Sequence, residues 1–184
     1  MDTFGIDIKD VRGRLGVLLP GMGAVGTTVI AGVLAIRNKL GLPIGSLTQM
    51  NHIRLGRRDE NRNPLIKDLI PLVEMEDIQF GGWDLFEDDA YESALTAGVL
   101  EKTLLDQIKD ELSAIKPMKA VFDRNYVKKL DGPHVKKAST KYEYYEMLRE
   151  DIRNFKTENK LDRLVMIWTG STEIFLKTGP VHQS

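Results

Sequence analysis

The glycine-rich segment Gly21-Met22-Gly23-Ala24-Val25-Gly26 constrains the fold most strongly. It follows an apolar run, Arg14 to Leu19, that predicts a buried strand, and it precedes apolar residues with helical spacing. A strand, a glycine turn and a helix in this order are typical of dinucleotide-binding folds. There the first glycine permits a tight turn, the second leaves room for a pyrophosphate, and the third allows close packing. The N–H groups at the helix start also attract phosphate. We therefore predict a phosphate-binding loop made by Gly21, Gly23, Ala24, Val25 and Gly26.

Two alternatives apply to the same region. The first is a glycine-rich turn that serves packing alone. The second is a membrane span, because Leu15 to Ile36 is 22 residues long and uncharged, which is enough to cross a bilayer. Five glycines, Pro20 and two threonines are spread through this segment. They divide it into strand, turn and helix, so we disfavour the span.

Short apolar runs alternate with helical patterns along the rest of the chain. The runs Ile44–Gln49 and Ile78–Phe80 predict strands, and Leu164–Trp168 predicts a central parallel strand. This alternation favours an α/β fold with a doubly wound parallel sheet, a Rossmann-like domain. We expect one domain over residues 14–184, preceded by a flexible tail at residues 1–13.

The helical segments have recognisable starts and faces. A capping box, Thr140 to Glu143, predicts a helix start, and Asp88-Asp89 suit another helix N-terminus. A single helix is predicted across residues 104–115. The faces expected to be apolar are Val25, Thr28, Val29, Gly32, Val33 and Ile36 in the first helix, and Tyr144, Leu148, Ile152 and Phe155 in the last.

One expected part of an NAD site is missing. Such folds place an acidic residue about 20 residues beyond the glycine loop, where it holds the adenosine ribose. The predicted second strand ends near Ser46-Leu47-Thr48 without an acid. Either the cofactor is not NAD or another residue takes this role. Asp84 is the candidate, because it follows a predicted strand and the pair Gly81-Gly82.

Composition excludes several classes of function. The chain has 26 Lys and Arg against 27 Asp and Glu, which argues against a generic nucleic-acid binder. It has no cysteine, which excludes disulfides, thiolate zinc sites and a cysteine nucleophile and fits a reducing cytosol. The three histidines, His52, His134 and His182, have no partners at ligand spacing, so we predict no metal site. The first residues show no signal-peptide pattern.

Seven segments carry a more specific pattern than the glycine loop: Pro43–Gln49, Leu65–Leu69, Phe80–Asp84, Asp88–Glu92, Ile115–Met118, Leu148–Arg153 and Ile167–Glu173. In their order and approximate spacing they resemble myo-inositol-1-phosphate synthase (inositol-3-phosphate synthase), the bacterial branch more than the eukaryotic one. The resemblance covers residues 14–184.

The resemblance implies an NAD-dependent isomerase of inositol and phospholipid biosynthesis. The family converts D-glucose 6-phosphate to myo-inositol phosphate by oxidation, enolisation, aldol cyclisation and reduction, with NAD regenerated. It also implies a cytoplasmic protein that forms a homo-tetramer at full length, without nucleic acid or membrane. The implied cofactor contacts are the pyrophosphate loop (Gly21, Gly23, Ala24, Gly26), the ribose residue Asp84, and the cofactor-lining segment Thr169, Gly170, Ser171 and Thr172. The eukaryotic branch has a more Asn-rich loop, and Asn in place of Ser171.

Length is the main departure from the family, whose members are more than twice as long. Their catalytic lysines and tetramer-forming sheet follow the point where this chain stops, so no catalytic residue is assigned. The resemblance therefore implies an NAD-binding part, truncated before the catalytic and tetramerisation part. A non-catalytic NAD-binding module and a different Rossmann dehydrogenase are the alternatives. The absence of a Tyr-x-x-x-Lys pair weakens the latter.

Overall fold

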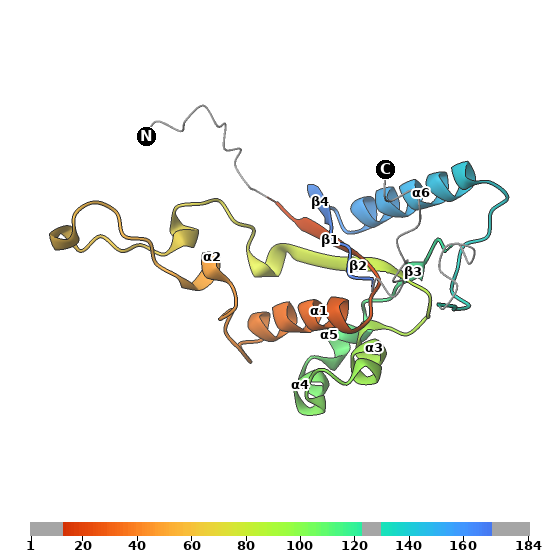
Figure 1. The fold of residues 1–184 in the computed structure, drawn as a ribbon, viewed down its shortest axis with the longest axis horizontal. Coiled ribbons are helices and arrows are strands. Elements are labelled where there is room, and N and C mark those ends of the chain that lie inside the picture. Colours follow the sequence, from red (N-terminus) through yellow and green to blue (C-terminus); the bar gives the residue numbers. More distant parts are fainter. Residues whose placement is uncertain (1–12, 123–129, 171–184) are drawn as a thin grey trace, which may run out of the picture.

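The computed structural model describes residues 13–122 and 130–170 (Figure 1). Its centre is a sheet of four parallel strands in the order β3-β2-β1-β4. The strands are β1 (Leu15–Pro20), β2 (Ile78–Asp84), β3 (Met118–Lys119) and β4 (Arg163–Met166). Strand β1 pairs with β2 along its whole length, from Leu15 opposite Ile78 to Pro20 opposite Trp83. All four carboxyl ends therefore lie at one edge of the sheet.

Helices cover both faces of the sheet, which confirms the doubly wound α/β prediction. One face carries α1 (Ala24–Arg37), α3 (Ala90–Ala97), α4 (Lys102–Gln107) and α5 (Lys109–Ser113), and the other carries α6 (Lys141–Glu158). In Figure 1, α6 lies above the sheet, and α1, α3 and α5 lie below it. Among the described residues, no helix combines the length and apolar character needed to cross a bilayer.

The main hydrophobic core lies between the sheet and the helices α1 and α3 to α5. Its members include Val17, Leu19, Ile30, Leu34, Phe80, Leu105, Ile108 and Leu112. Each fully buried side chain of this size contributes about 1.5–3 kcal/mol. On the opposite face, the ring of Phe155 in α6 packs against Gly16 and Gly81, where an added Cβ would approach it to 3.1 Å and 2.6 Å. Glycine in these strands therefore permits the close approach of α6.

The buried face of α1 differs from the predicted one. Gly26, Thr27, Ile30, Ala31, Leu34 and Ala35 are buried, whereas Val25 is 60% exposed and Val29 43%. The helix is apolar all round, so its spacing alone did not select a face. The buried face includes Gly26, where a Cβ would lie 3.0 Å from the Gly21 carbonyl oxygen, so glycine permits this face to lie close to the turn.

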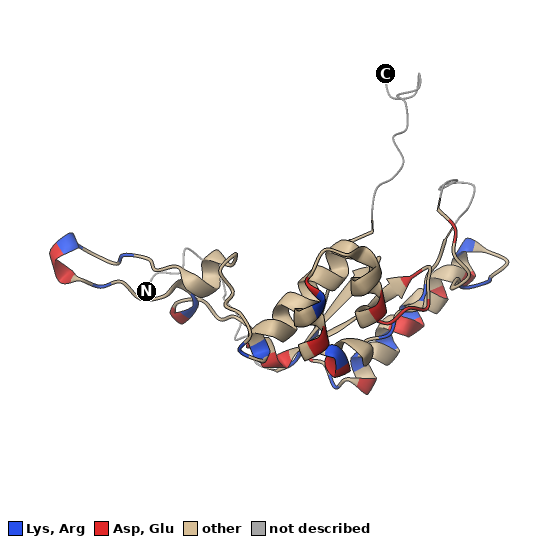
Figure 2. Ribbon diagram, turned by 90° about the horizontal axis from the view of Figure 1, so that it is seen from below, with Lys and Arg blue, Asp and Glu red and all other residues tan. Residues whose placement is uncertain are grey.

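The segment between α1 and β2, residues 38–77, contains no second strand. The prediction of a strand at Ile44–Gln49 was wrong: this part contains the short helix α2 (Leu47–Met50). The segment, here called the arm, extends from the body of the domain (Figure 1), and its tip carries charges of both signs (Figure 2). Hydrogen bonds from Ile53 N–H to Pro64 (3.0 Å) and from Leu55 N–H to Arg62 (2.9 Å) join its two sides.

Arg37, the last residue of α1, closes the base of the arm. Its Nε donates to the carbonyl oxygen of Met75 at 2.7 Å, and its guanidinium also donates to the carbonyl of Ile78, the first residue of β2. The end of α1 and the start of β2 are therefore fixed to each other whatever lies between them.

Two further predictions need correction. The predicted central strand near Leu164–Trp168 corresponds to β4, which lies at the edge of the described sheet. Val165, Met166, Ile167 and Trp168 are 43–72% exposed there. The single helix expected over residues 104–115 is divided at Ile108 into α4 and α5, because Ile108 leaves the helical region (φ −117°, ψ 19°).

The predicted helix starts are confirmed. The carboxylate of Asp89 accepts the N–H groups of Tyr91 and Glu92 at the start of α3. Thr140 accepts the N–H of Glu143 at the start of α6, in the predicted capping box.

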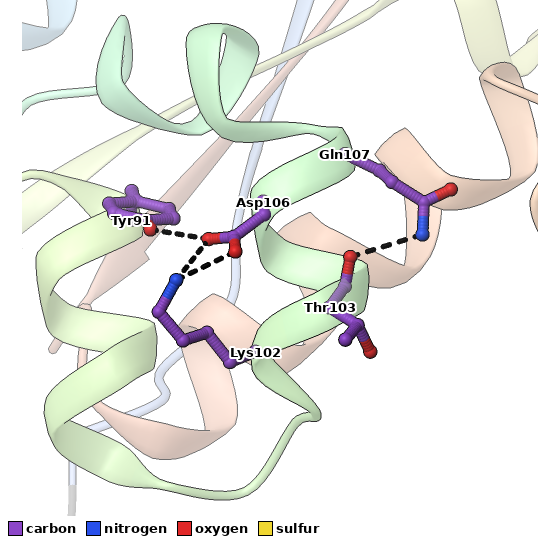
Figure 3. Close-up of polar contacts among 5 residues, drawn as sticks. All are labelled: Tyr91, Lys102, Thr103, Asp106 and Gln107. Atoms are coloured by element: carbon purple, nitrogen blue, oxygen red, sulfur yellow. Dashed lines mark hydrogen bonds and ion pairs between the residues drawn. The ribbon is translucent and has the colours of Figure 1, made fainter.

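A polar cluster joins α3 to α4 (Figure 3). The hydroxyl of Tyr91 donates to Asp106 at 2.7 Å, and Lys102 Nζ lies 2.8 Å and 2.6 Å from the two carboxylate oxygens of Asp106. The hydrogen bond from Lys102, and then the one from Tyr91, lower the pKa of Asp106 below its usual 3.8. The same contact with Asp106 raises the pKa of Tyr91.

This cluster predicts a pH-dependent contribution to stability. A carboxyl group with a lowered pKa in the folded state stabilises the fold above its unfolded pKa, and that contribution disappears as the pH falls through the folded value. Asp106→Asn should therefore lower the urea midpoint at pH 7, and the difference from wild type should shrink below pH 3.8. Urea titrations at pH 7 and pH 3 measure it, with Asp59→Asn in the arm as the control. A difference that stays constant with pH would contradict the assignment.

Candidate cofactor site

The glycine loop lies at the carboxyl edge of the sheet, between the end of β2 and the segment after β4. The N–H of Gly21 donates to the carbonyl oxygen of Trp83 at 2.8 Å. From the other side, the hydroxyl of Thr169 donates to the carbonyl oxygens of Gly21 (2.6 Å) and Pro20 (3.2 Å). The strands β2 and β4 both pair with β1. Trp83 near the end of β2 and Thr169 after β4 therefore hold the loop by hydrogen bonds.

The three glycines of the loop meet three different requirements. Gly21 has φ +88°, and a Cβ there would collide with the Cα of Gly170. A Cβ on Gly26 would lie 3.0 Å from the carbonyl oxygen of Gly21, so this glycine permits close contact between turn and helix. A Cβ on Gly23 would meet no atom of residues 13–122 and 130–170 within 4 Å. Packing among these residues therefore does not require glycine at position 23, and they leave the space beside it open.

The open space lies at the N-terminus of α1. Gly23 is the N-cap, no described side chain caps the helix there, and its first turn has no acidic residue. The first N–H groups of a helix have no partner within it, and the helix dipole makes this end positive. Ala24 and Val25 belong to this first turn, where 60% of Val25 is exposed. The arrangement is suited to a phosphate group.

Asp84 is the last residue of β2, directly beside the loop. Its Oδ2 accepts the N–H of Met22 at 2.7 Å, and its Oδ1 accepts the N–H of Phe86 at 3.1 Å. Each carboxylate oxygen retains capacity for a further donor, such as a sugar hydroxyl. A dinucleotide fold has its acid at the end of the strand after the first helix, and Asp84 holds that place. It is distant in sequence because the arm precedes β2.

Most of the predicted site residues come together. Gly21, Gly23, Ala24, Val25, Gly26, Asp84, Thr169 and Gly170 gather at this edge of the sheet. Ser171 and Thr172 lie outside the described residues. Two contacts were not foreseen: the bond from Met22 N–H to Asp84, and the link from the indole of Trp83 to Asp151 of α6. Neither has a local sequence signal, because its partners are 62 and 68 residues apart.

Other site chemistries find little support in the described residues. Tyr91 and Lys102 both contact Asp106, and the raised pKa of Tyr91 makes it a poor proton-transfer group. Within residues 13–122 and 130–170, no group of three or more His, Asp or Glu side chains is placed to hold a metal ion.

Comparison with known proteins gives a consistent result. Residues 15–184 match the NAD-binding family described as myo-inositol-1-phosphate synthase. Inositol-3-phosphate synthase 1 of Bacteroides thetaiotaomicron is 51% identical over 179 residues, covering 97% of this chain and 41% of the relative. Inositol-3-phosphate synthase isozyme 1 of Arabidopsis thaliana is 35% identical, covering 93% of this chain and 37% of the relative.

A solved structure agrees with these relatives. The crystal structure of inositol-3-phosphate synthase from Caenorhabditis elegans superposes with a TM-score of 0.77 at 26% identity, covering 90% of this chain and 35% of that one. The chain thus spans about two fifths or less of the length of these relatives. The match begins at the first residue of β1 and includes the glycine loop and Asp84. The chain belongs to the myo-inositol-1-phosphate synthase family, and the part it matches is the family's NAD-binding domain.

Proposed function

We propose that the chain holds NAD for an inositol-3-phosphate synthase, which converts D-glucose 6-phosphate to myo-inositol phosphate. The observation that carries the proposal is the open space at Gly23, bordered by the start of α1 and close to the carboxylate of Asp84. A turn that served only the packing of the described residues would not need glycine at this position. The space has the N–H groups and the acid that a dinucleotide requires.

Each part of the site has a distinct role in this proposal. The N–H groups at the start of α1 hold the pyrophosphate, and Asp84 accepts hydroxyls of the adenosine ribose. Thr169 fixes the loop and, with Gly170, borders the cofactor; the resemblance extends this border to Ser171 and Thr172. When bound, NAD supplies the hydride acceptor and donor for the reaction.

The remaining features of the proposed enzyme follow from the family. We propose glucose 6-phosphate as its substrate and a homo-tetramer as the form of the full-length protein. We place it in the cytoplasm, which agrees with the absence of cysteine. The net charge of −1 supports the proposal that nucleic acid is not a partner. The glycines and Pro20 that divide Leu15 to Ile36 support the proposal that no membrane is a partner.

NAD titration into wild type and Asp84→Ala tests the proposal. Hydrogen bonds to a charged group contribute about 1.5–3 kcal/mol, so Asp84→Ala should weaken NAD by roughly tenfold to a hundredfold. Wild type should also reject NADP, because the 2′-phosphate would meet the negative carboxylate. Asp84→Asn should reduce this discrimination. Isothermal titration calorimetry measures all three effects.

The control is Asp88→Ala, which removes an exposed acid four residues further along the chain. It should bind NAD as wild type does. Absence of NAD binding by wild type would contradict the proposed function. Tight binding of NADP by wild type would contradict only the role of Asp84.

A further inference from the structure

The indole of Trp83 connects the end of β2 to α6. Its side chain is buried, and the indole N–H donates to Asp151 Oδ2 at 2.7 Å. Lys136 Nζ lies 3.0 Å from Oδ1 and 2.9 Å from Oδ2 of the same carboxylate. The side chains of Lys136 and Asp151 are only 14% and 17% exposed. A buried indole N–H requires an acceptor, and this one is a carboxylate held by a cation.

The main chain of the same tryptophan holds the glycine loop. The carbonyl oxygen of Trp83 accepts the N–H of Gly21 at 2.8 Å. The next residue, Asp84, accepts the N–H of Met22 at 2.7 Å. Residues 83 and 84 thus anchor two successive N–H groups of the loop, while the Trp83 side chain is anchored on α6.

Lys136 is itself held in place. Its N–H donates to the carbonyl oxygen of Ala120 at 2.8 Å, and the N–H of Ala120 donates to His134 at 3.0 Å. The N–H of His134 donates to the carbonyl oxygen of Leu85, the residue after β2, at 2.9 Å. The cation that fixes Asp151 is therefore anchored to the same end of the sheet as the loop.

We infer that Asp151 is a positioning residue for the NAD site, acting through Trp83. It fixes the last residues of β2, and these fix Gly21, Met22 and the carboxylate of Asp84. The expected effect of Asp151 on NAD binding rests on the proposed function. A separate contact also holds α6 on the sheet, because Phe155, one turn further along, packs against Gly16 and Gly81.

The first test needs no cofactor. In Asp151→Ala, the amide protons of Gly21 and Met22 should exchange at least about tenfold faster than in wild type, which corresponds to losing a hydrogen bond to a charged group. The amides of Ile30 and Ala31 in α1 report global unfolding and should change less. Asp151→Asn retains an acceptor for the indole and should recover most of the protection. Glu146→Ala, which removes an exposed ion pair with Arg149 on the same helix, is the matched control. Unchanged exchange at Gly21 and Met22 would overturn the inference, whether or not NAD binds.

The second test is a double-mutant cycle on NAD affinity. Asp151→Ala should raise the NAD dissociation constant by about tenfold in the wild-type background, but by less than about threefold when Asp84 is already alanine. A role in overall stability alone would give additive effects, and additivity would overturn the inference. A wild-type chain that does not bind NAD would contradict the proposed function instead, and the exchange measurement would still decide the role of Asp151.

Discussion

Gly23→Val is expected to abolish NAD binding while the protein stays folded. Gly23 has φ −79°, outside the left-handed region, and no atom of the described residues lies within 4 Å of an added Cβ, so valine there clashes with none of them. The added side chain instead projects into the space that we assign to the pyrophosphate. Affinity should fall by at least about a hundredfold, because a blocked phosphate loses its contacts with the helix N-terminus. Calorimetry measures the affinity, and circular dichroism with a melting curve checks the fold.

Gly32→Val is the matched control for this variant. Gly32 lies in the same helix, and a Cβ there also meets no described atom within 4 Å, but it is two turns from the loop. It should bind NAD as wild type does. Gly21→Val should behave differently from both, because Gly21 has φ +88° and abuts Gly170; this variant should lose stability. Unchanged NAD affinity in Gly23→Val would show that the pyrophosphate lies elsewhere.

The second large effect concerns turnover: residues 1–184 should not form inositol phosphate on their own. An acid–base catalyst needs a pKa near the working pH. Among the described lysines, Lys102 has its pKa raised by its hydrogen bond to Asp106, Lys136 is paired with Asp151, and Lys109 lies over the ring of Tyr91. Lys119 lies opposite Asp84 in the pairing of β2 with β3, but its side chain is exposed, whereas a cation that stabilises an enolate acts best in a site that excludes water.

Phosphorus NMR of the purified protein with glucose 6-phosphate and NAD measures this prediction. A full-length bacterial inositol-3-phosphate synthase serves as the positive control, and calorimetry on the same sample checks that NAD is bound. Turnover by a verified 184-residue species would place the chemistry within this chain. Bound NAD without turnover would agree with a chain that holds the cofactor for catalytic groups located elsewhere.

The parts of the site that depend on local sequence were predictable. A strand, a glycine turn and a helix follow one another within Leu15–Arg37, and each imposes its pattern on adjacent residues. The position of Asp84 at the end of a strand was predictable from the strand and the Gly81-Gly82 pair before it, although it lies far beyond the usual spacing. The caps at Asp89 and Thr140 were found for the same reason: a cap and its partner are two or three residues apart.

The remaining features depend on tertiary contacts. The face of α1 was mispredicted because apolar residues surround the helix, and the face that is buried is the one that includes Gly26, which lies close to the turn. Ile44–Gln49 has the composition of a strand but lies in the arm, without a sheet to join. The link between Trp83 and Asp151 spans 68 residues and has no sequence signal.

The arm has a consequence for how such proteins are recognised and how their genes vary. Because Arg37 ties the end of α1 to the start of β2, the loop and Asp84 keep their spatial relation while the chain between them leaves the body of the domain. Insertions and deletions within the arm can therefore accumulate without altering the geometry of the cofactor site. A sequence pattern that requires a fixed number of residues between the glycine loop and the acid depends on the length of the arm and not on the geometry of the site. Such a pattern does not match this chain. The pairing of β1 with β2, from Leu15 opposite Ile78 to Pro20 opposite Trp83, describes the site independently of the length of the arm.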